Sequence, residues 1–192
     1  DDGLQHYSMN RDVEVVVIDG SRGFGNGFCI PAGPLREPIR RLSSVDFIAV
    51  NDEVEKKLYP PHVHVFHFFY KPVKFVNLLT GQVCDPDNWD GSEIVHAVAA
   101  IGAPERFKRS LEGLGLQVIL HPYDDHDRLK LRDLSFNDGL DIIITAKDAV
   151  KLEWEVDHDV WCLEIEAVLD PSVTDNLIAC LNHKGLDPIA RT

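Results

Sequence analysis

Six short apolar runs, rich in β-branched side chains, constrain the fold of this chain more than any other feature. They lie at residues 13–18, 45–50, 95–101, 118–120, 142–145 and 160–165. Each run is nearly continuous rather than alternating with polar residues, as expected for strands that are buried on both faces of a parallel sheet. The runs therefore predict a mainly parallel β-sheet.

Helix-like segments separate the later runs. Residues 104–114 place Phe107, Leu111 and Leu114 at helical spacing, with a proline in the first turn and Gly115 at the end. Further helices are predicted at 128–136, where the apolar face is weaker, from an N-cap at Thr145 through 152, and at 171–181. Strands that alternate with helices predict βαβ units and an α/β fold.

One segment interrupts this alternation. Residues 63–70 and 73–79 are two apolar stretches joined by Lys71-Pro72, and the turn-prone residues 80–82 follow them. They predict a small antiparallel excursion, and the polar connection after it places a boundary near residues 85–93. We therefore expect two domains, residues 1–84 and residues 85–192.

The chain is acidic, because 32 Asp and Glu residues oppose 19 Lys and Arg residues and give a formal charge of −13. A nucleic-acid partner is not expected, since binding to phosphates requires a basic surface.

The four cysteines are widely spaced, so reduced thiols are favoured over a disulfide or zinc framework. His62, His64 and His67 are a weak candidate metal set, because on a strand the third side chain points away from the first two.

A glycine- and proline-rich stretch at residues 21–38 follows the first predicted strand. Glycines after a parallel strand let the backbone turn tightly and approach a ligand closely. Arg36 and Glu37 lie between Pro34 and Pro38; an arginine suits phosphate recognition and a glutamate suits a hard cation. A surface ion pair between the two side chains is the alternative. The chain contains neither a G-x-G-x-x-G fingerprint nor a G-x-x-x-x-G-K-[ST] loop.

Two further groups of acidic side chains are candidates for chemistry. Asp1 and Asp2 look like the end of a Walker-B-type strand, where one carboxylate holds Mg²⁺ and the next orients a phosphate-bound reactant. Three aspartates surround His126 at residues 124–127. A carboxylate beside an imidazole raises the pKa of the imidazole and fixes its orientation, which is useful in a proton relay. A solvated acidic loop is the alternative for this second group.

An ordered set of short segments spans nearly the whole chain. It comprises DDGLQH (1–6), VIDG (17–20), RGFGNG (22–27), PAGPLREP (31–38), Asn77-Leu78 with Gly81, residues 98–102 with Pro104 and Phe107, Gly115, Asp125-His126 and residues 145–151. Together these segments resemble the tetraacyldisaccharide 4′-kinase family, the lipid A 4′-kinases of Gram-negative bacteria. The resemblance implies a P-loop NTPase-like parallel sheet with helices and an added substructure. It also implies transfer of the ATP γ-phosphate to the 4′-hydroxyl of a tetraacylated glucosamine disaccharide, with Mg²⁺.

The same resemblance implies roles for individual residues. Asp1, Asp2 and Glu37 would hold the metal, and Asp2 would also act in catalysis. Arg36 and Gln5 would bind the phosphates of ATP, and His126 would support the general base. These roles suit phosphoryl transfer, which depends mainly on positioning and on charge neutralisation.

The chain departs from the family pattern in lacking a Walker A loop, an N-terminal aspartate base and a membrane-attaching helix. We therefore expect it to be the C-terminal portion of such a kinase, soluble by itself, and unable alone to bind ATP tightly or to turn over. The parent would bind a lipid A disaccharide precursor and contact the cytoplasmic face of the inner membrane peripherally. A non-catalytic α/β module that binds lipid or phosphate is the alternative, and a metal-binding protein that uses the histidine-rich strand is a weaker one.

Overall fold

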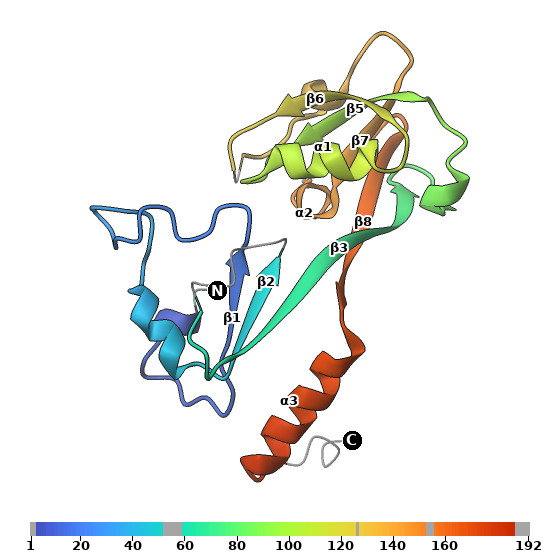
Figure 1. The fold of residues 1–192 in the computed structure, drawn as a ribbon. Helices are drawn as coiled ribbons and strands as arrows, with labels where there is room; N and C mark the ends of the chain where they lie inside the picture. Colours follow the sequence, from blue (N-terminus) through green and yellow to red (C-terminus); the bar gives the residue numbers. More distant parts are fainter. Residues whose placement is uncertain (1–2, 52–58, 126, 153–155, 187–192) are drawn as a thin grey trace. The chain divides into compact units, whose positions relative to one another are not determined.

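The computed structural model describes residues 3–51, 59–125, 127–152 and 156–186 (Figure 1). Its contacts divide the chain into two units: residues 1–69 with 167–192, and residues 70–166. The strands β3 (His64–Asn77) and β8 (Val160–Leu169) each contribute residues to both units. The units therefore differ in extent from the segments 1–84 and 85–192. The division into domains 1–84 and 85–192 stays a prediction.

Parallel strands form the sheet of the first unit. β1 (Val15–Asp19) pairs with β2 (Phe47–Asn51), and β2 pairs with the first residues of β3. The unit also contains the 3-10 helices η1 (Gly3–Gln5) and η2 (Ile39–Ser44) and the helix α3 (Pro171–His183). Leu42 of η2 packs against Ile18 and Ile48 of the sheet in one buried cluster. This packing holds η2, and the residues just before it, beside β1.

The second unit is built around β5 (Ile94–Ala99). β6 (Gln117–Pro122) and β7 (Asp141–Thr145) flank β5, β8 follows β7, and all three pairings are parallel (Figure 1). α1 (Pro104–Glu112) connects β5 to β6 and buries Phe107 and Leu111 in the core. Every residue of β5 after Ile94 is buried, which explains why this run does not alternate. The predicted α/β fold with a mainly parallel sheet is confirmed.

The two apolar stretches predicted at 63–70 and 73–79 form a single strand, because β3 runs through Lys71-Pro72 without a break over its 14 residues. A residue that precedes proline is restricted to extended backbone, so this dipeptide continues a strand as readily as it ends one. The antiparallel pair forms later, where β4 (Val83–Cys84) returns along the end of β3. Asn77 makes the turn, since its side-chain oxygen accepts hydrogen bonds from the backbone N–H groups of Leu79 and Thr80, both at 3.0 Å.

The helices differ from the prediction mainly in length. α1 and α3 begin at the predicted prolines. The segment at 128–136 forms only the 3-10 turn η5 (Leu131–Leu134), which suffices to bury Leu129 and Leu134. Thr145 caps α2 (Ala146–Ala149) as predicted, but the helix ends before residue 152. Within the described ranges, no helix combines the length and the apolar character that crossing a bilayer would need.

Candidate functional site

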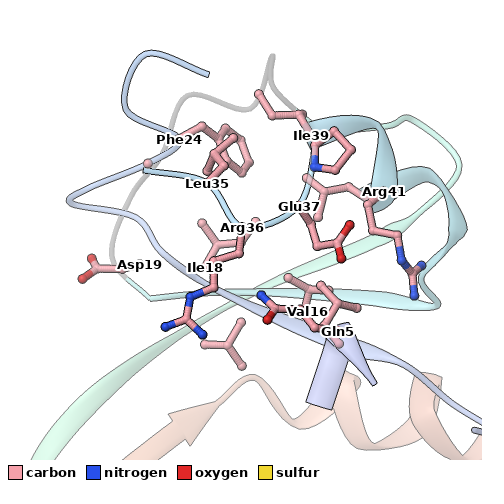
Figure 2. Close-up of a pocket in the computed structure, with 15 residues that line it drawn as sticks. Gln5, Val16, Ile18, Asp19, Phe24, Leu35, Arg36, Glu37, Ile39 and Arg41 are labelled. Atoms are coloured by element: carbon pink, nitrogen blue, oxygen red, sulfur yellow. The ribbon is translucent and has the colours of Figure 1, made fainter. Parts of the chain in front are cut away.

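A cavity of about 260 Å³ lies in the first unit, between η1, β1 and the residues that lead into η2 (Figure 2). Its floor and walls are mainly apolar, with side chains that include Val16, Ile18, Phe24, Leu35 and Ile39. Its polar lining comes from Gln5, Asp19, Arg36, Glu37 and Arg41. We call this cavity the candidate pocket. It is lined by Gln5, Arg36 and Glu37, three predicted site residues from segments about 30 positions apart in the sequence.

The glycine-rich loop after β1 folds back on itself, and Arg36 and Glu37 therefore line the candidate pocket. The side chain of Asn26 donates to the carbonyl of Ala32 at 2.9 Å and accepts from the N–H of Phe28 at 3.1 Å. The backbone N–H of Ile30 donates to the carbonyl of Leu35 at 2.8 Å. Gly33 packs so closely here that a Cβ would collide with the Asn26 side chain and the Phe28 carbonyl. The glycine is therefore required by close backbone approach.

Arg36 and Gln5 supply hydrogen-bond donors to one part of the candidate pocket. In Figure 2 the Arg36 guanidinium and the Gln5 amide extend toward the same region beside Ile18, whereas the Asp19 carboxylate points away. Asp19 instead accepts from the backbone and the hydroxyl of Ser21, at 3.1 and 2.7 Å. A guanidinium with an adjacent amide can bind phosphate oxygens through charge-assisted and neutral hydrogen bonds.

Glu37 and Arg41 lie on the other side of the candidate pocket (Figure 2). The hydroxyl of Tyr7 donates to Oε1 of Glu37 at 2.6 Å. This hydrogen bond to a carboxylate raises the pKa of Tyr7 above its ordinary value. Nη2 of Arg41 donates to both carboxylate oxygens of Glu14, and the hydrogen bond to Glu14 raises the pKa of the Arg41 guanidinium.

Of the three proposed metal ligands, the structure describes only Glu37. Glu37 presents a carboxylate to the candidate pocket, and carboxylate oxygen suits Mg²⁺. Asp1 and Asp2 lie outside the described residues. Among residues that the structure does describe, no three His, Cys, Asp or Glu side chains gather closely enough to hold a metal ion. The ligand set Asp1, Asp2 and Glu37 therefore stays a prediction, with one member located.

The predicted catalytic histidine, His126, also lies outside the described residues. Its chain neighbour Asp125, in the second unit, accepts from Lys147 Nζ at 2.9 Å. Lys147 belongs to the short helix that Thr145 caps at the end of β7. Both side chains of this pair are exposed, so the pair also fits the alternative of a solvated acidic loop.

Sequence reasoning missed three residues around the candidate pocket: Arg11, Glu14 and Arg41. Glu14 Oε1 accepts from Arg11 Nη1 at 2.7 Å and from Arg41 Nη2 at 2.8 Å. A signal was present, since Glu14 is the one charged residue inside the apolar run 13–18. A charge in such a run requires a partner when the strand packs.

Comparisons with known proteins identify the family of this chain. The family described as Tetraacyldisaccharide-1-P 4'-kinase matches residues 1–182. A tetraacyldisaccharide 4'-kinase of Pseudomonas putida (strain W619) is 42% identical over 172 residues, which cover 90% of this chain and 50% of that protein. One from Pseudomonas aeruginosa (strain UCBPP-PA14) is 41% identical over 183 residues, covering 95% of this chain and 54% of the relative.

A solved structure, LpxK from Aquifex aeolicus in complex with ATP, superposes with a TM-score of 0.67 over 95% of this chain and 55% of that one. At 19% sequence identity this likeness supports the fold. The chain spans about half the length of the curated relatives that it matches. From the match over residues 1–182, the chain belongs to the tetraacyldisaccharide-1-P 4'-kinase family.

Proposed function

We propose that this chain forms part of an enzyme that transfers the γ-phosphate of ATP to the 4′-hydroxyl of a tetraacylated glucosamine disaccharide, a step in lipid A biosynthesis. The family match over residues 1–182 carries the proposal. The candidate pocket supports it, because a cation, an amide and a carboxylate line one cavity there. Phosphoryl transfer needs such groups for positioning and charge neutralisation.

Each nominated residue has a role in this proposal. Arg36 binds phosphate oxygens of ATP through its guanidinium, and Gln5 donates an amide N–H to the same phosphates. Asp1, Asp2 and Glu37 hold Mg²⁺, which neutralises charge on the phosphates when it is bound. Asp2 also orients the reacting phosphate.

The reaction forms one bond and breaks another. The 4′-hydroxyl oxygen attacks the γ-phosphorus, the bond between that phosphorus and the bridging oxygen breaks, and ADP leaves. The proton of the hydroxyl passes to a general base that His126 supports. Arg36 stabilises the charge that develops on the transferred group.

The lipid substrate places the enzyme in peripheral contact with the cytoplasmic face of the inner membrane. A nucleic-acid partner is not part of the proposal, since the formal charge of −13 disfavours binding to a polyanion.

The test is a transfer assay with the product of the complete gene, ATP, Mg²⁺ and a tetraacylated glucosamine disaccharide 1-phosphate. We expect a product that carries a new phosphate at the 4′ position, as read by mass spectrometry and phosphorus NMR. Binding of the lipid without transfer from ATP would overturn the proposal and favour a non-catalytic binding module.

A further inference from the structure

We propose that Glu14 is a positioning residue for ATP use: its carboxylate fixes the segment that carries Gln5 relative to the turn that carries Arg36 and Glu37. This inference rests on the proposed kinase function. It concerns a residue that need not touch the nucleotide, because it acts through the two segments that line the candidate pocket.

The carboxylate of Glu14 joins two arginines from opposite directions along the chain. Oε1 accepts from Arg11 Nη1 at 2.7 Å, and both oxygens accept from Arg41 Nη2, at 2.8 and 2.9 Å. The three side chains are only 15–16% exposed. Ion pairs with this degree of burial are screened less by salt than exposed pairs are. We call these three residues the Glu14 network.

Arg11 connects the Glu14 network to the segment that contains Gln5. The second terminal nitrogen of Arg11 donates to the backbone carbonyl of His6 at 2.6 Å and also to that of Gly3. These carbonyls flank Gln5 on both sides in the sequence. Arg11 therefore holds the backbone on both sides of Gln5, the residue whose side chain lines the candidate pocket.

Arg41 connects the Glu14 network to the opposite wall. It lies in η2, which begins two residues after Glu37, and its own side chain lines the candidate pocket. Loss of the Glu14 carboxylate would therefore release both walls at once and leave two arginines without their shared acceptor.

The backbone of Glu14 is anchored independently of its side chain. Its N–H donates to Asp46 Oδ2 at 2.9 Å, and its carbonyl accepts from the N–H groups of Asp46 and Phe47, both at 3.1 Å. Asp46 in turn pairs with Lys184 Nζ at 2.7 Å. Replacing only the carboxylate should therefore leave the strand pairing in place and loosen the pocket walls.

The experiment uses the product of the complete gene and compares Glu14→Gln, Gln5→Ala and the double variant. We expect Glu14→Gln to raise KM for ATP about tenfold with a smaller change in kcat. In the Gln5→Ala background, Glu14→Gln should raise KM for ATP by clearly less than tenfold, because both substitutions weaken the same contact between Gln5 and ATP. Glu164→Gln is the matched control, since it removes the exposed pair with Lys74 in the second unit.

Native hydrogen exchange gives a second readout that does not need activity. The amides of residues 3–9 should exchange faster in Glu14→Gln than in the parent protein or the control. Unchanged exchange there, an unchanged KM for ATP, or equal losses in both backgrounds would overturn the inference.

Two further outcomes are also decisive. If Glu14→Gln fails to fold, Arg11→Gln is measured in the same way; unfolding of both variants would assign the network to stability alone and overturn the inference. If the parent protein transfers no phosphate, the proposed function fails, and the exchange of residues 3–9 still decides whether Glu14 positions that segment.

Discussion

Each unit contains a partly buried polar network. The first unit has the Glu14 network, and the second has a cluster of two histidines and an aspartate. The two networks connect different kinds of segment. In the second cluster, His96 Nε2 lies 2.8 Å from Asp138 Oδ2, and His96 Nδ1 lies 2.9 Å from His121 Nε2. Phe136 stacks on His96 with ring centroids 3.8 Å apart. We call these four residues the histidine cluster.

The two networks differ in what they hold together. The Glu14 network joins two segments that line the candidate pocket. The histidine cluster joins neighbouring strands, since His96 lies on β5 and His121 on β6, and their carboxylate partner lies just before β7. If the proposed function holds, similar chemistry supports a binding site in the first unit and the sheet in the second. Substitutions in and around the candidate pocket should reduce activity more than stability. Substitutions in the histidine cluster should reduce stability more than activity.

Arg36→Ala should have the largest effect on activity. We expect kcat/KM for ATP to fall by about 10²-fold or more in the product of the complete gene, because a charge that acts on the transferring phosphate is lost. The melting temperature should change little. Arg40→Ala is the matched control, since Arg40 is an exposed neighbour on η2. Equal values of kcat/KM for the two variants would mean that Arg36 is a surface charge without a role in ATP binding.

His96→Ala should have the largest effect on stability. The side chain is only 4% exposed, so its loss leaves a cavity beside Phe136 and removes two hydrogen bonds. We expect the free energy of unfolding to fall by about 2 kcal/mol. Urea denaturation followed by tryptophan fluorescence measures this.

The control for His96→Ala is His67→Ala, which changes an exposed histidine on β3. Activity per folded molecule should be the same in both variants. A stable His96→Ala variant with poor activity would remove the distinction between site and scaffold.

The fold was largely predictable because burial leaves a local pattern in the sequence. The continuous runs at 45–50 and 95–101 correspond to strands that are buried on both faces. The length of β3 was not predictable in this way. Its end depends on the side chain of Asn77 and on pairing with Cys84, and neither is visible in the hydrophobic pattern.

The candidate site was predictable only in part. Arg36, Glu37 and Gln5 stand in recognisable motifs and do share a cavity. The contact between Glu14 and Arg41 joins residues 27 positions apart, so only tertiary structure reveals it. Charged residues at that spacing carry no local signal of pairing, although the isolated glutamate in an apolar run does indicate that a partner is needed.

Gly33→Ala should have an intermediate effect that sharpens the comparison. The new methyl group would collide with backbone as well as side-chain atoms in the loop that delivers Arg36. We expect kcat/KM for ATP to fall about tenfold, equivalent to roughly 1.4 kcal/mol, with a smaller loss of stability. Ala32→Ser, an exposed change at the adjacent position, is the control. A large stability loss with normal activity per folded molecule would mean that the loop belongs to the scaffold.

The smallest predicted effect is a pH dependence of stability that arises in the histidine cluster. Burial, followed by the charge of His96, lowers the pKa of His121 below its ordinary value. The unfolded chain therefore binds a proton more readily than the folded one, and His121 reduces stability as the pH falls below about 6.5. His158 acts in the opposite direction, because its hydrogen bond to Asp157 raises its pKa and adds stability at low pH. Only a difference between variants isolates His121.

His121→Phe keeps an aromatic ring beside Phe136 and removes the titrating group. It should be less stable than the parent at about pH 7.5, because His96 loses a hydrogen-bond partner, and this deficit should shrink toward about pH 5.5. We expect the change in the deficit to correspond to a shift in melting temperature of about 1–2 °C. A deficit that stays constant between these pH values would mean that His121 has the same pKa in the folded and unfolded chains, and that the cluster stabilises the sheet by packing and hydrogen bonding alone.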